Sequence, residues 1–484
     1  MRAIILAAGE GKRLRPLTLN KPKPLLEIRG KTLLENMIFY LKKLGVKEIF
    51  VITGYKNHLF TPLEKKLGFK QIFYKDYKNK NSAATLQYVS NLIQKGTFIL
   101  NGDLFINKEF SQFLRFNSNQ FLAQKITNAP FWGYLTDENS KLIEIDTNAT
   151  NGYGDGIAFL DNPQDIQTLK NSLLKCSTQD YWEACIKNSL HKIDFYISYC
   201  ENFYTEIDCI EDALCARLIT PEEIAKQCSS DGKIQKLFSV TNINYKINFQ
   251  NKQKVLRISR PKLNQIINPN NEQKILSILP NHLTAQNEFY NNGLKLSTFL
   301  QGYKPLTKEE ICQEGVLELL IKKIKILHSK NLKDYPNFTP IFMVNEINNY
   351  ESLAKIKLVT QLEHKKILDI ASKIDTMDFI LCHRDLQLPN ILYNGKDIKL
   401  IDFEYSGFSS YIWELGNLSA ELELEEKQIE KIIHLYGKIT RQEILEGQIL
   451  SNYIWALWSW IYDKIDLGRD YLVRLHKNLK DLNP

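Results

Sequence analysis

The sequence predicts an α/β fold, with a doubly wound, mostly parallel-sheet domain followed by a two-lobed α+β domain. Three observations support this prediction. The chain has 484 residues, which exceeds the roughly 250–300 residues at which a single hydrophobic core stops growing. Up to Asp103, short apolar runs alternate with helical patterns, as in βαβ units. Farther along, two β-like segments precede a long stretch in which helical patterns dominate.

The elements expected in the N-terminal part follow its apolar runs. Ala3–Ala8 is a buried strand that leads into a glycine loop, and a helix over 32–44 begins at a threonine cap. Asn81 or Ser82 caps a later helix. Three further strands are expected at Glu48–Thr53, Lys70–Tyr74 and Thr97–Leu100. Ligands of doubly wound sheets bind beyond the carboxyl ends of the strands, which is where the glycine loop and Asp103 fall.

The C-terminal part begins without a Pro/Gly-rich linker. A helical pattern over 210–227 runs across the expected boundary, which we place between residues 217 and 218. The expected domains are therefore residues 1–217 and 218–484. The next expected elements are β-like segments at 237–249 and 255–259 and a helix at 271–279.

The composition is that of an ordinary globular protein, with 44% apolar and 24% charged residues. The net charge of +8 comes from lysines dispersed among asparagines and glutamates, and the sequence has no RGG, zinc-finger or RNP pattern. We therefore expect no nucleic-acid partner and a mildly basic surface that suits anionic nucleotides.

The sequence shows no signal for export or membrane insertion. Ala3–Ala8 has the length of a strand and leads directly into a glycine loop, unlike a signal peptide. The richest apolar stretch, Tyr453–Tyr462, is shorter than the ~18 residues that a membrane span needs. A cytoplasmic protein is expected. Its eight cysteines form no C-x-x-C pair and no zinc-finger spacing, so we expect them to be reduced.

The loop after the first strand carries residues suited to a polyphosphate. Gly9 and Gly11 let backbone N–H groups approach a phosphate, Arg13 offers a planar fork of donors, and Lys23 lies between two prolines that restrict its direction. A glycine turn after a strand is common for steric reasons alone. The whole string, a strand followed by AAGEGKRLRPLT and KPKPLLEI, is more specific.

This string resembles the sugar-nucleotide pyrophosphorylase and cytidylyltransferase family over about residues 1–217. The resemblance implies in-line attack of a phosphate monoester on the α-phosphorus of a nucleoside triphosphate, with release of pyrophosphate and use of Mg²⁺. It also implies the roles of individual residues. Triphosphate binding falls to Gly9, Gly11 and Arg13, charge stabilisation at the α-phosphate to Lys23, and metal binding to Asp103 and Asp208, with Glu206 beside the latter.

Two short segments resemble the small bacterial phosphocholine cytidylyltransferases in particular. These are the compact FYTEIDCIEDA stretch and the sequence Asp180-Tyr181-Trp182. The resemblance makes Trp182 a candidate for binding the trimethylammonium group of phosphocholine, because ring faces attract such a cation. A plain core role for this tryptophan is the alternative.

A second motif, H-x-D-x-x-x-x-N followed by I-D-F, lies in the C-terminal part. Asp385 is placed to orient a substrate hydroxyl, and Asn390 and Asp402 supply hard oxygen ligands for Mg²⁺ bridging the phosphates of ATP. His383 is expected to brace the loop rather than to transfer protons. A β-rich lobe followed by an α-rich lobe with this motif is the layout of a kinase-like phosphotransferase.

The second part resembles the choline/ethanolamine kinase family, within the aminoglycoside-phosphotransferase-like kinases, over about residues 218–484. The resemblance is carried by IDFEYSG at 401–407, WELGN at 413–417 and IWALWS at 454–459. It implies that Arg257 grips phosphate and that Glu272 is its partner on a helix. The chain departs from the family at the loop 239–242, which lacks the usual glycines, and at Glu414, where aspartate is more usual.

Trp455 and Trp458 fall on one face if their segment is helical. Tryptophans most often serve as core anchors, which is the alternative interpretation. With the kinase motif upstream and further aromatic residues nearby, including Tyr471, a cage for a quaternary ammonium is favoured.

The two parts together predict consecutive reactions, because a kinase makes a phosphate monoester and a nucleotidyltransferase consumes one. We expect a bifunctional choline kinase and CTP:phosphocholine cytidylyltransferase that binds CTP, ATP, choline and phosphocholine. One alternative uses ethanolamine or another amino alcohol. Others are a sugar-1-phosphate nucleotidyltransferase fused to a small-molecule kinase, and a regulatory protein in which one nucleotide site is inactive. The oligomeric state is left open.

Overall fold

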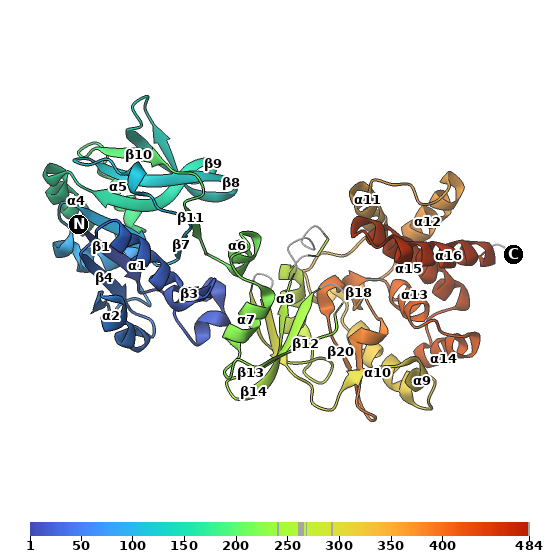
Figure 1. Ribbon diagram of the computed structural model, residues 1–484. Coiled ribbons are helices and arrows are strands. Elements are labelled where there is room, and N and C mark those ends of the chain that lie inside the picture. The colour runs from blue at the N-terminus through green and yellow to red at the C-terminus, as the bar shows by residue number, and fades with distance from the viewer. Residues whose placement is uncertain (240–241, 260–265, 268, 292–293, 483–484) are drawn as a thin grey trace. The chain divides into compact units, whose positions relative to one another are not determined.

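The computed structural model describes residues 1–239, 242–259, 266–267, 269–291 and 294–482. Its contacts divide the chain into two compact units, whose elements are labelled in Figure 1. The first unit comprises Met1–Pro261 and Phe289–Leu296, and the second comprises Lys262–Glu288 and Ser297–Pro484. The expected boundary between residues 217 and 218 separates the two sets of motifs within the sequence, and it stays a prediction.

The first unit contains a seven-stranded sheet in the order β10-β8-β9-β6-β1-β4-β5. Its strands are β1 (Arg2–Ala7), β4 (Glu48–Thr53), β5 (Lys70–Phe73), β6 (Thr97–Asn101), β8 (Asn119–Thr136), β9 (Leu142–Leu160) and β10 (Phe195–Tyr199). The four strands β6, β1, β4 and β5 are parallel, and β9 runs antiparallel to β6 and β8. This arrangement confirms the predicted doubly wound, mostly parallel sheet.

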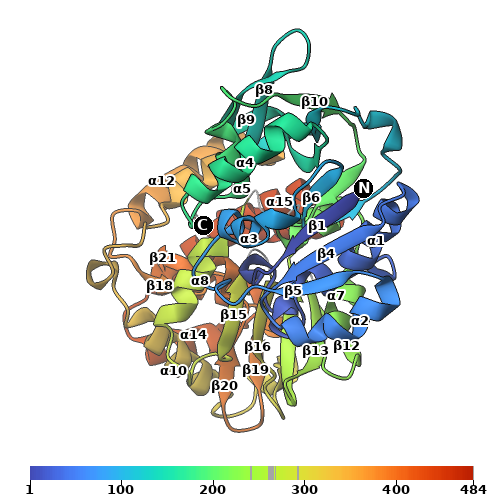
Figure 2. The ribbon, with the colours of Figure 1, turned by 90° about the vertical axis from the view of Figure 1, so that its left-hand side faces the viewer.

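Helices cover both faces of the parallel strands (Figure 2). Ile5 of β1 packs in a cluster with α1, whereas its neighbour Ile4 packs in a second cluster with α3 and α4, because successive strand side chains point to opposite faces. The helices are α1 (Leu33–Lys43), α2 (Thr61–Leu67), α3 (Ser82–Tyr88), α4 (Pro163–Lys175) and α5 (Trp182–Lys187). Both predicted caps are confirmed, since Thr32 forms a capping box with Glu35 and Asn81 caps α3.

A short antiparallel ribbon brings together two distant parts of the sequence. β7 (Leu104–Ile106) pairs with β11 (Tyr204–Glu206), with Leu104 opposite Glu206. The N–H of Ile207 also donates to the carbonyl of Asp103 at 3.1 Å. Carboxylates that follow β6 and β11 therefore lie side by side.

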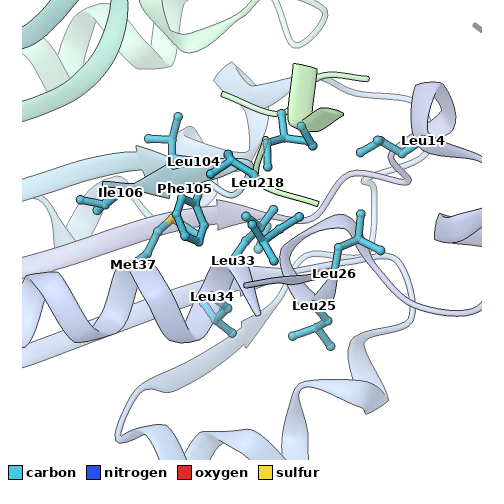
Figure 3. Packing of buried hydrophobic residues seen from close by; sticks show 14 of the residues in the cluster. Leu14, Leu25, Leu26, Leu33, Leu34, Met37, Leu104, Phe105, Ile106 and Leu218 are labelled. Carbon is cyan, nitrogen blue, oxygen red and sulfur yellow. The ribbon is translucent and has the colours of Figure 1, made fainter. Parts of the chain in front are cut away.

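Apolar side chains fix this ribbon and the glycine loop against α1 (Figure 3). Leu25 and Leu26 follow Lys23, and Leu104 follows Asp103; all three leucines are buried in one cluster with Leu33. Tight packing of the residues next to Lys23 and Asp103 leaves those two polar side chains little freedom.

The helix expected over 210–227 is wrong as a single element. The structure has two helices there, α6 (Ile210–Cys215) and α7 (Pro221–Cys228). Pro221 lacks the N–H that a continuous helix requires, and Thr220 forms a capping box that begins α7.

A five-stranded sheet of order β12-β13-β14-β16-β15 follows α7 along the chain. Its strands are β12 (Ile234–Leu237), β13 (Ile243–Phe249), β14 (Lys252–Ile258), β15 (Asn287–Asn291) and β16 (Leu294–Thr298). Val240 and Thr241, in the expected nucleotide loop, lie outside the described residues.

The second unit is rich in helices. They are α8 (Pro269–Ile278), α9 (Lys308–Ile311), α10 (Val316–His328), α11 (Met343–Ala354), α12 (Gln361–Ile374), α13 (Tyr411–Glu421), α14 (Glu426–Tyr436), α15 (Arg441–Ile461) and α16 (Ile465–Asp481). Short strands β18 (Ile380–Cys382), β19 (Ile391–Tyr393), β20 (Ile398–Leu400) and β21 (Gly407–Ser409) surround the H-x-D motif. A β-rich segment followed by a helix-rich one confirms the predicted α+β arrangement. Among the described residues, no helix has the length and apolar character needed to span a bilayer.

Two glycines allow α13 and α15 to cross closely. A Cβ added at Gly416 would lie 2.3 Å from the carbonyl carbon of Gly447, and one added at Gly447 would lie 2.1 Å from the oxygen of Ile412. A side chain at either position would force the helices apart. The close crossing packs α15, which carries Trp455 and Trp458, against α13, whose Glu414 contacts the H-x-D loop.

The expectation that all cysteines are reduced is wrong for two of them. Cys176 and Cys185 form a disulfide, with Cα atoms 5.7 Å apart, between the end of α4 and the middle of α5. The spacing of these two cysteines in the sequence matches no recognised motif, so their pairing becomes visible only in the fold. The other six cysteines are free thiols.

Replacing Ile224 of α7 by alanine should destabilise the first unit. Its side chain is fully buried in the cluster that contains Leu25 and Leu104, and such truncations cost about 2–5 kcal/mol through lost burial and the cavity left behind. Leu174→Ala is the matched control, because Leu174 is 65% exposed. Urea unfolding followed by circular dichroism measures both. Equal losses for the two variants would show that α7 is not part of the core.

Candidate active sites

A cavity of about 850 Å³ lies at the carboxyl ends of β1 and β6 in the first unit. It is lined by the glycine loop, by residues after β6 and by the ribbon end that carries Glu206 and Asp208. The residues that line it include six that the sequence predicts for this site, namely Gly9, Gly11, Arg13, Lys23, Asp103 and Asp208. The fold thus brings together all six, although Asp208 is far from the others in sequence.

Lys23 is the centre of the charged groups in this cavity. Its Nζ lies 2.9 Å from Oδ2 of Asp103 and 3.3 Å from Oδ1 of Asp208. Arg13 donates to both carboxylate oxygens of Asp208, at 2.9 and 3.0 Å, which is a bidentate pair. Burial acts to lower the pKa of Lys23, but the charges of Asp103 and Asp208 outweigh it and the pKa is raised. The lysine is therefore a permanent cation at neutral pH.

The carboxylates of Asp103, Glu206 and Asp208 fit a divalent cation. Their oxygens lie within 4.8 Å of one another. Oδ1 of Asp103 is buried and has no hydrogen-bond partner, which is costly unless a cation or water satisfies it. An all-oxygen set of this kind suits Mg²⁺. These residues could hold the metal that the sequence predicts.

The two glycines of the loop have different roles. Gly11 has φ +61°, and a Cβ there would lie 3.0 Å from Cγ2 of Thr18, so a larger residue would be strained as well as crowded. A Cβ at Gly9 would meet nothing within 4 Å, so this glycine leaves open space at the cavity wall. Sequence reasoning missed Gly102, where a Cβ would lie 2.8 Å from the carbonyl oxygen of Leu6.

Trp182 does not line this cavity. It is 1% exposed and packs against Phe121 in the core, with ring centroids 5.8 Å apart. The aromatic side chains at the cavity include Tyr77, Trp132 and Tyr181, and the rings of Trp132 and Tyr181 meet edge to face at 5.7 Å. Glu183 lines the same wall. Of the D-Y-W segment, Tyr181 lines the cavity, whereas Trp182 is a core residue.

The second site is built around Asp385, in the loop that follows β18. The side-chain amide of Gln387 donates to both carboxylate oxygens of Asp385 at 3.1 Å, and Nδ2 of Asn390 donates to Oδ2 at 2.8 Å. Burial raises the pKa of Asp385, and neighbouring carboxylates, among them Glu421 and Asp402, raise it further. A carboxylate with a raised pKa is a better proton acceptor.

Asn390 and Asp402 are neighbours in space. The N–H of Ile401 donates to the backbone carbonyl of Asn390 at 3.0 Å, and Asp402 follows with φ +65°. Because Nδ2 of Asn390 is used by Asp385, its Oδ1 is the atom available to a cation. An amide oxygen and a carboxylate fit Mg²⁺. His383 bonds the carbonyl of Ile401 at 2.8 Å, which agrees with a bracing role.

Glu414 holds the loop that carries Asp385. Its fully buried carboxylate accepts the backbone N–H groups of His383 and Arg384, each at 2.7 Å. Burial acts to raise the pKa of Glu414, but the imidazole of His328, 3.6 Å away, and the backbone hydrogen bonds lower it. Glu414 therefore braces the loop at a position where this chain has glutamate and the family it resembles more usually has aspartate.

Arg257 and Glu272 belong to different units. Arg257 lies on β14 of the first unit, where its guanidinium donates to the hydroxyl of Tyr290 at 3.2 Å. Glu272 lies on α8 of the second unit and is buried. Their expected pairing stays a prediction.

Aromatic rings gather around Trp455 and Trp458 on α15. The two indoles meet edge to face with centroids 6.2 Å apart, and Trp455 meets Tyr405 at 5.3 Å. Nε1 of Trp458 donates to the hydroxyl of Tyr405 at 2.8 Å, and its ring lies 4.9 Å from that of Tyr462. Because α15 is helical, the predicted placement of both tryptophans on one face is confirmed.

Sequence reasoning missed Glu421, at the end of α13. The hydroxyl of Tyr471 donates to Oε2 of Glu421 at 3.3 Å, while Oε1 is buried without a hydrogen-bond partner. Burial raises the pKa of Glu421 to about 7, against the opposing effects of Tyr471 and Arg474. No motif marks this residue; only its position near Asp385 and Tyr471 does. Glu421 and the ring of Tyr471 thus lie together, and a carboxylate beside a ring suits a cation.

Comparison with known proteins divides the chain in two. Residues 2–142 match the family described as Nucleotidyl transferase, and residues 229–435 match the family described as Choline/ethanolamine kinase. The chain is 31% identical over 219 residues to a choline-phosphate cytidylyltransferase of Streptococcus pneumoniae, covering 44% of this chain and 95% of that enzyme. It is 27% identical over 204 residues to a 2-aminoethylphosphonate cytidylyltransferase of Lancefieldella rimae, covering 40% and 82%.

The C-terminal part is similar to animal kinases. It is 25% identical over 292 residues to ethanolamine kinase 1 of Homo sapiens. The matched region covers 50% of this chain and 63% of that kinase. The chain therefore spans a little less than two thirds of the length of that relative.

Replacing Glu414 by alanine should weaken the second unit. Two buried backbone N–H groups would lose their acceptor, at about 1–3 kcal/mol for each unsatisfied donor. Glu430→Ala, on the exposed side of α14, is the matched control. Thermal unfolding measures the loss. A Glu414→Ala protein that unfolds at the same temperature as Glu430→Ala would contradict the bracing role.

Proposed function

Because the chain belongs to the nucleotidyltransferase family in its N-terminal part and to the choline/ethanolamine kinase family in its C-terminal part, we propose that it makes CDP-choline in two steps. The second unit phosphorylates choline with ATP, and the first transfers a cytidylyl group from CTP to the phosphocholine and releases pyrophosphate. One observation carries the proposal: one chain matches both a nucleotidyltransferase family and a choline/ethanolamine kinase family. A kinase of this kind would make the phosphate monoester that the transferase consumes.

In the kinase step, the hydroxyl oxygen of choline attacks the γ-phosphorus of ATP and ADP leaves. Asp385 accepts the hydroxyl proton, and Gln387 and Asn390 hold its carboxylate in place. Mg²⁺, held by Asn390 and Asp402, would neutralise phosphate charge. Glu414 keeps the loop rigid through the N–H groups of His383 and Arg384.

In the transfer step, a phosphate oxygen of phosphocholine attacks the α-phosphorus of CTP, and the bond to pyrophosphate breaks. No covalent intermediate with the enzyme is needed. Lys23, Arg13 and the loop N–H groups near Gly9 and Gly11 neutralise the phosphates and fix the attacking and leaving oxygens in line. Mg²⁺ held by Asp103 and Asp208 would share this charge. Arg13 can turn from Asp208 toward the triphosphate, because its side chain is 62% exposed.

Each site offers groups suited to a quaternary ammonium. In the kinase, Trp455, Trp458 and Glu421 combine ring faces with an unpartnered carboxylate oxygen. In the transferase, Trp132, Tyr181 and Glu183 line the cavity in the same chemical combination. A trimethylammonium cannot donate hydrogen bonds, so ring faces and a diffuse negative charge suit it best.

A second candidate function uses ethanolamine, or another primary amine, in the same two steps. It is favoured by the similarity to human ethanolamine kinase 1 and to an enzyme that acts on 2-aminoethylphosphonate. A sugar-1-phosphate substrate has less support, because it offers no cation for the aromatic rings. Lys23 and Asp103 are present in the first site and Asp385 in the second, which argues against a regulatory protein with one inactive site.

Substitutions should separate the two activities. Asp208→Ala removes a carboxylate that pairs with Lys23 and Arg13, so cytidylyl transfer should be lost while phosphorylation of choline continues. Asp385→Ala should lose the kinase activity and still convert supplied phosphocholine. Product masses identify each step. Loss of both activities in either folded variant would argue against two independent sites.

Trp455→Leu and Trp458→Leu should weaken choline binding. Leucine keeps apolar bulk but removes the ring face, which is worth about 0.5–2 kcal/mol, or roughly 2- to 30-fold in affinity. Steady-state kinetics should show a higher KM for choline and little change in the KM for ATP. Phe342→Leu, an exposed position on the second unit, is the control. Equal changes in both KM values would indicate that the two tryptophans only pack in the core and do not bind choline.

Choline affinity should rise with pH around neutrality. The pKa of Glu421 is about 7 in the free protein, so its carboxyl is largely neutral at about pH 6 and ionised at about pH 8; a bound cation favours the ionised form. The dissociation constant, followed by tryptophan fluorescence without ATP, should fall by up to about tenfold over this range. Glu421→Gln should bind more weakly and without this pH dependence. A wild-type protein with pH-independent affinity would rule out the titration of Glu421.

A further inference from the structure

The disulfide closes a loop that forms part of the first cavity. Cys176 follows α4 and Cys185 lies on α5, and the residues between them include Tyr181 and Glu183, which line the cavity. The bond thus ties together the two ends of a wall segment rather than two distant parts of the fold.

The same loop is fastened to the opposite segment of the wall by backbone contacts. The N–H of Asn81 donates to the carbonyl of Thr178 at 2.9 Å, and the N–H of Ala83 donates to that of Asp180 at 3.1 Å. The N–H of Trp182 donates to Oγ of Ser82 at 3.0 Å. Asn81 and Ser82 also line the cavity. The placement of Tyr181 therefore depends on a frame made of these hydrogen bonds and the disulfide.

The two sulfurs differ in accessibility. Cys185 is fully buried, whereas Cys176 is half-buried at the end of α4. A small thiolate can attack the sulfur of Cys176, forming a mixed disulfide and releasing the sulfur of Cys185, which takes up a proton. A second thiol then displaces the first as a disulfide. In total the protein gains two hydrogens and two small thiols become one disulfide.

We propose that the Cys176–Cys185 bond is a reversible redox control of the first active site. When the bond is closed, the two ends of the loop that carries Tyr181 and Glu183 are tied together. When it is reduced, this tie is lost, and the hydrogen bonds to residues 81–83 and the ring contact of Tyr181 with Trp132 remain. The amino-alcohol phosphate then binds more weakly, and the kinase is unaffected because the second unit contains neither cysteine. The nature of this ligand rests on the proposed function.

The test compares the full-length protein equilibrated in oxidised and in reduced glutathione. Alkylation and mass analysis identify which thiols appear, and hydrogen exchange over residues 177–184 reports the loop without any substrate. We expect Cys176 and Cys185 to be alkylated only after reduction, the loop to exchange faster, and the KM for phosphocholine to rise several-fold while the KM for choline is constant. Cys176→Ser with Cys185→Ala should match the reduced protein in both glutathione buffers. Cys312→Ser, an exposed thiol of the second unit, should behave as wild type.

Unpaired thiols at both positions in oxidised glutathione, or equal loop exchange in the two states, would overturn the proposal. An unchanged KM for phosphocholine despite a looser loop would overturn it as well. If the loop responds as expected but the protein accepts a different phosphate monoester, the redox control stands and the proposed substrate is wrong.

Discussion

The ion pairs of Lys23 with Asp103 and Asp208 join three segments that are far apart in the sequence. Three carboxylates whose oxygens lie within 4.8 Å of one another repel, so a nearby cation is needed to hold them together. Lys23 provides that charge, and Arg13 adds a bidentate contact to Asp208. The β7–β11 ribbon and the leucines beneath it bring the backbone into register, and the ion pairs then align the side chains for phosphate chemistry.

The second unit holds the buried carboxylates of Asp385 and Glu414 mainly by hydrogen bonds. Asp385 is held by two side-chain amides rather than by a cation, and Glu414 is satisfied by backbone N–H groups. Both carboxylates are buried, where an unpaired charge would be costly. The hydrogen bonds therefore fix the catalytic loop while leaving Asp385 without a permanent positive partner, which keeps its pKa raised and suits it to accept a proton.

Local signals in the sequence predicted much of this structure. Thr32, Asn81 and the H-x-D motif each specify a cap or a loop by chemistry within a few residues, and the two-part family membership follows from such strings. Pro221 was also a local signal, but it was overlooked within a helical pattern. The cavity-facing role of Tyr181 rather than Trp182, the unpartnered oxygen of Glu421 and the disulfide depend on packing between distant elements, which periodicity does not encode.

The most direct test of the two-step account is one reaction of the wild-type protein with Mg²⁺, ATP and equal amounts of choline and ethanolamine, together with equal amounts of CTP, GTP and UTP. Mass spectrometry identifies the products over time. The account predicts that phosphocholine appears first and is converted to CDP-choline, with ADP and pyrophosphate as co-products. A predominant CDP-ethanolamine product, or a phosphorylated amine that never acquires a nucleotide, would contradict it.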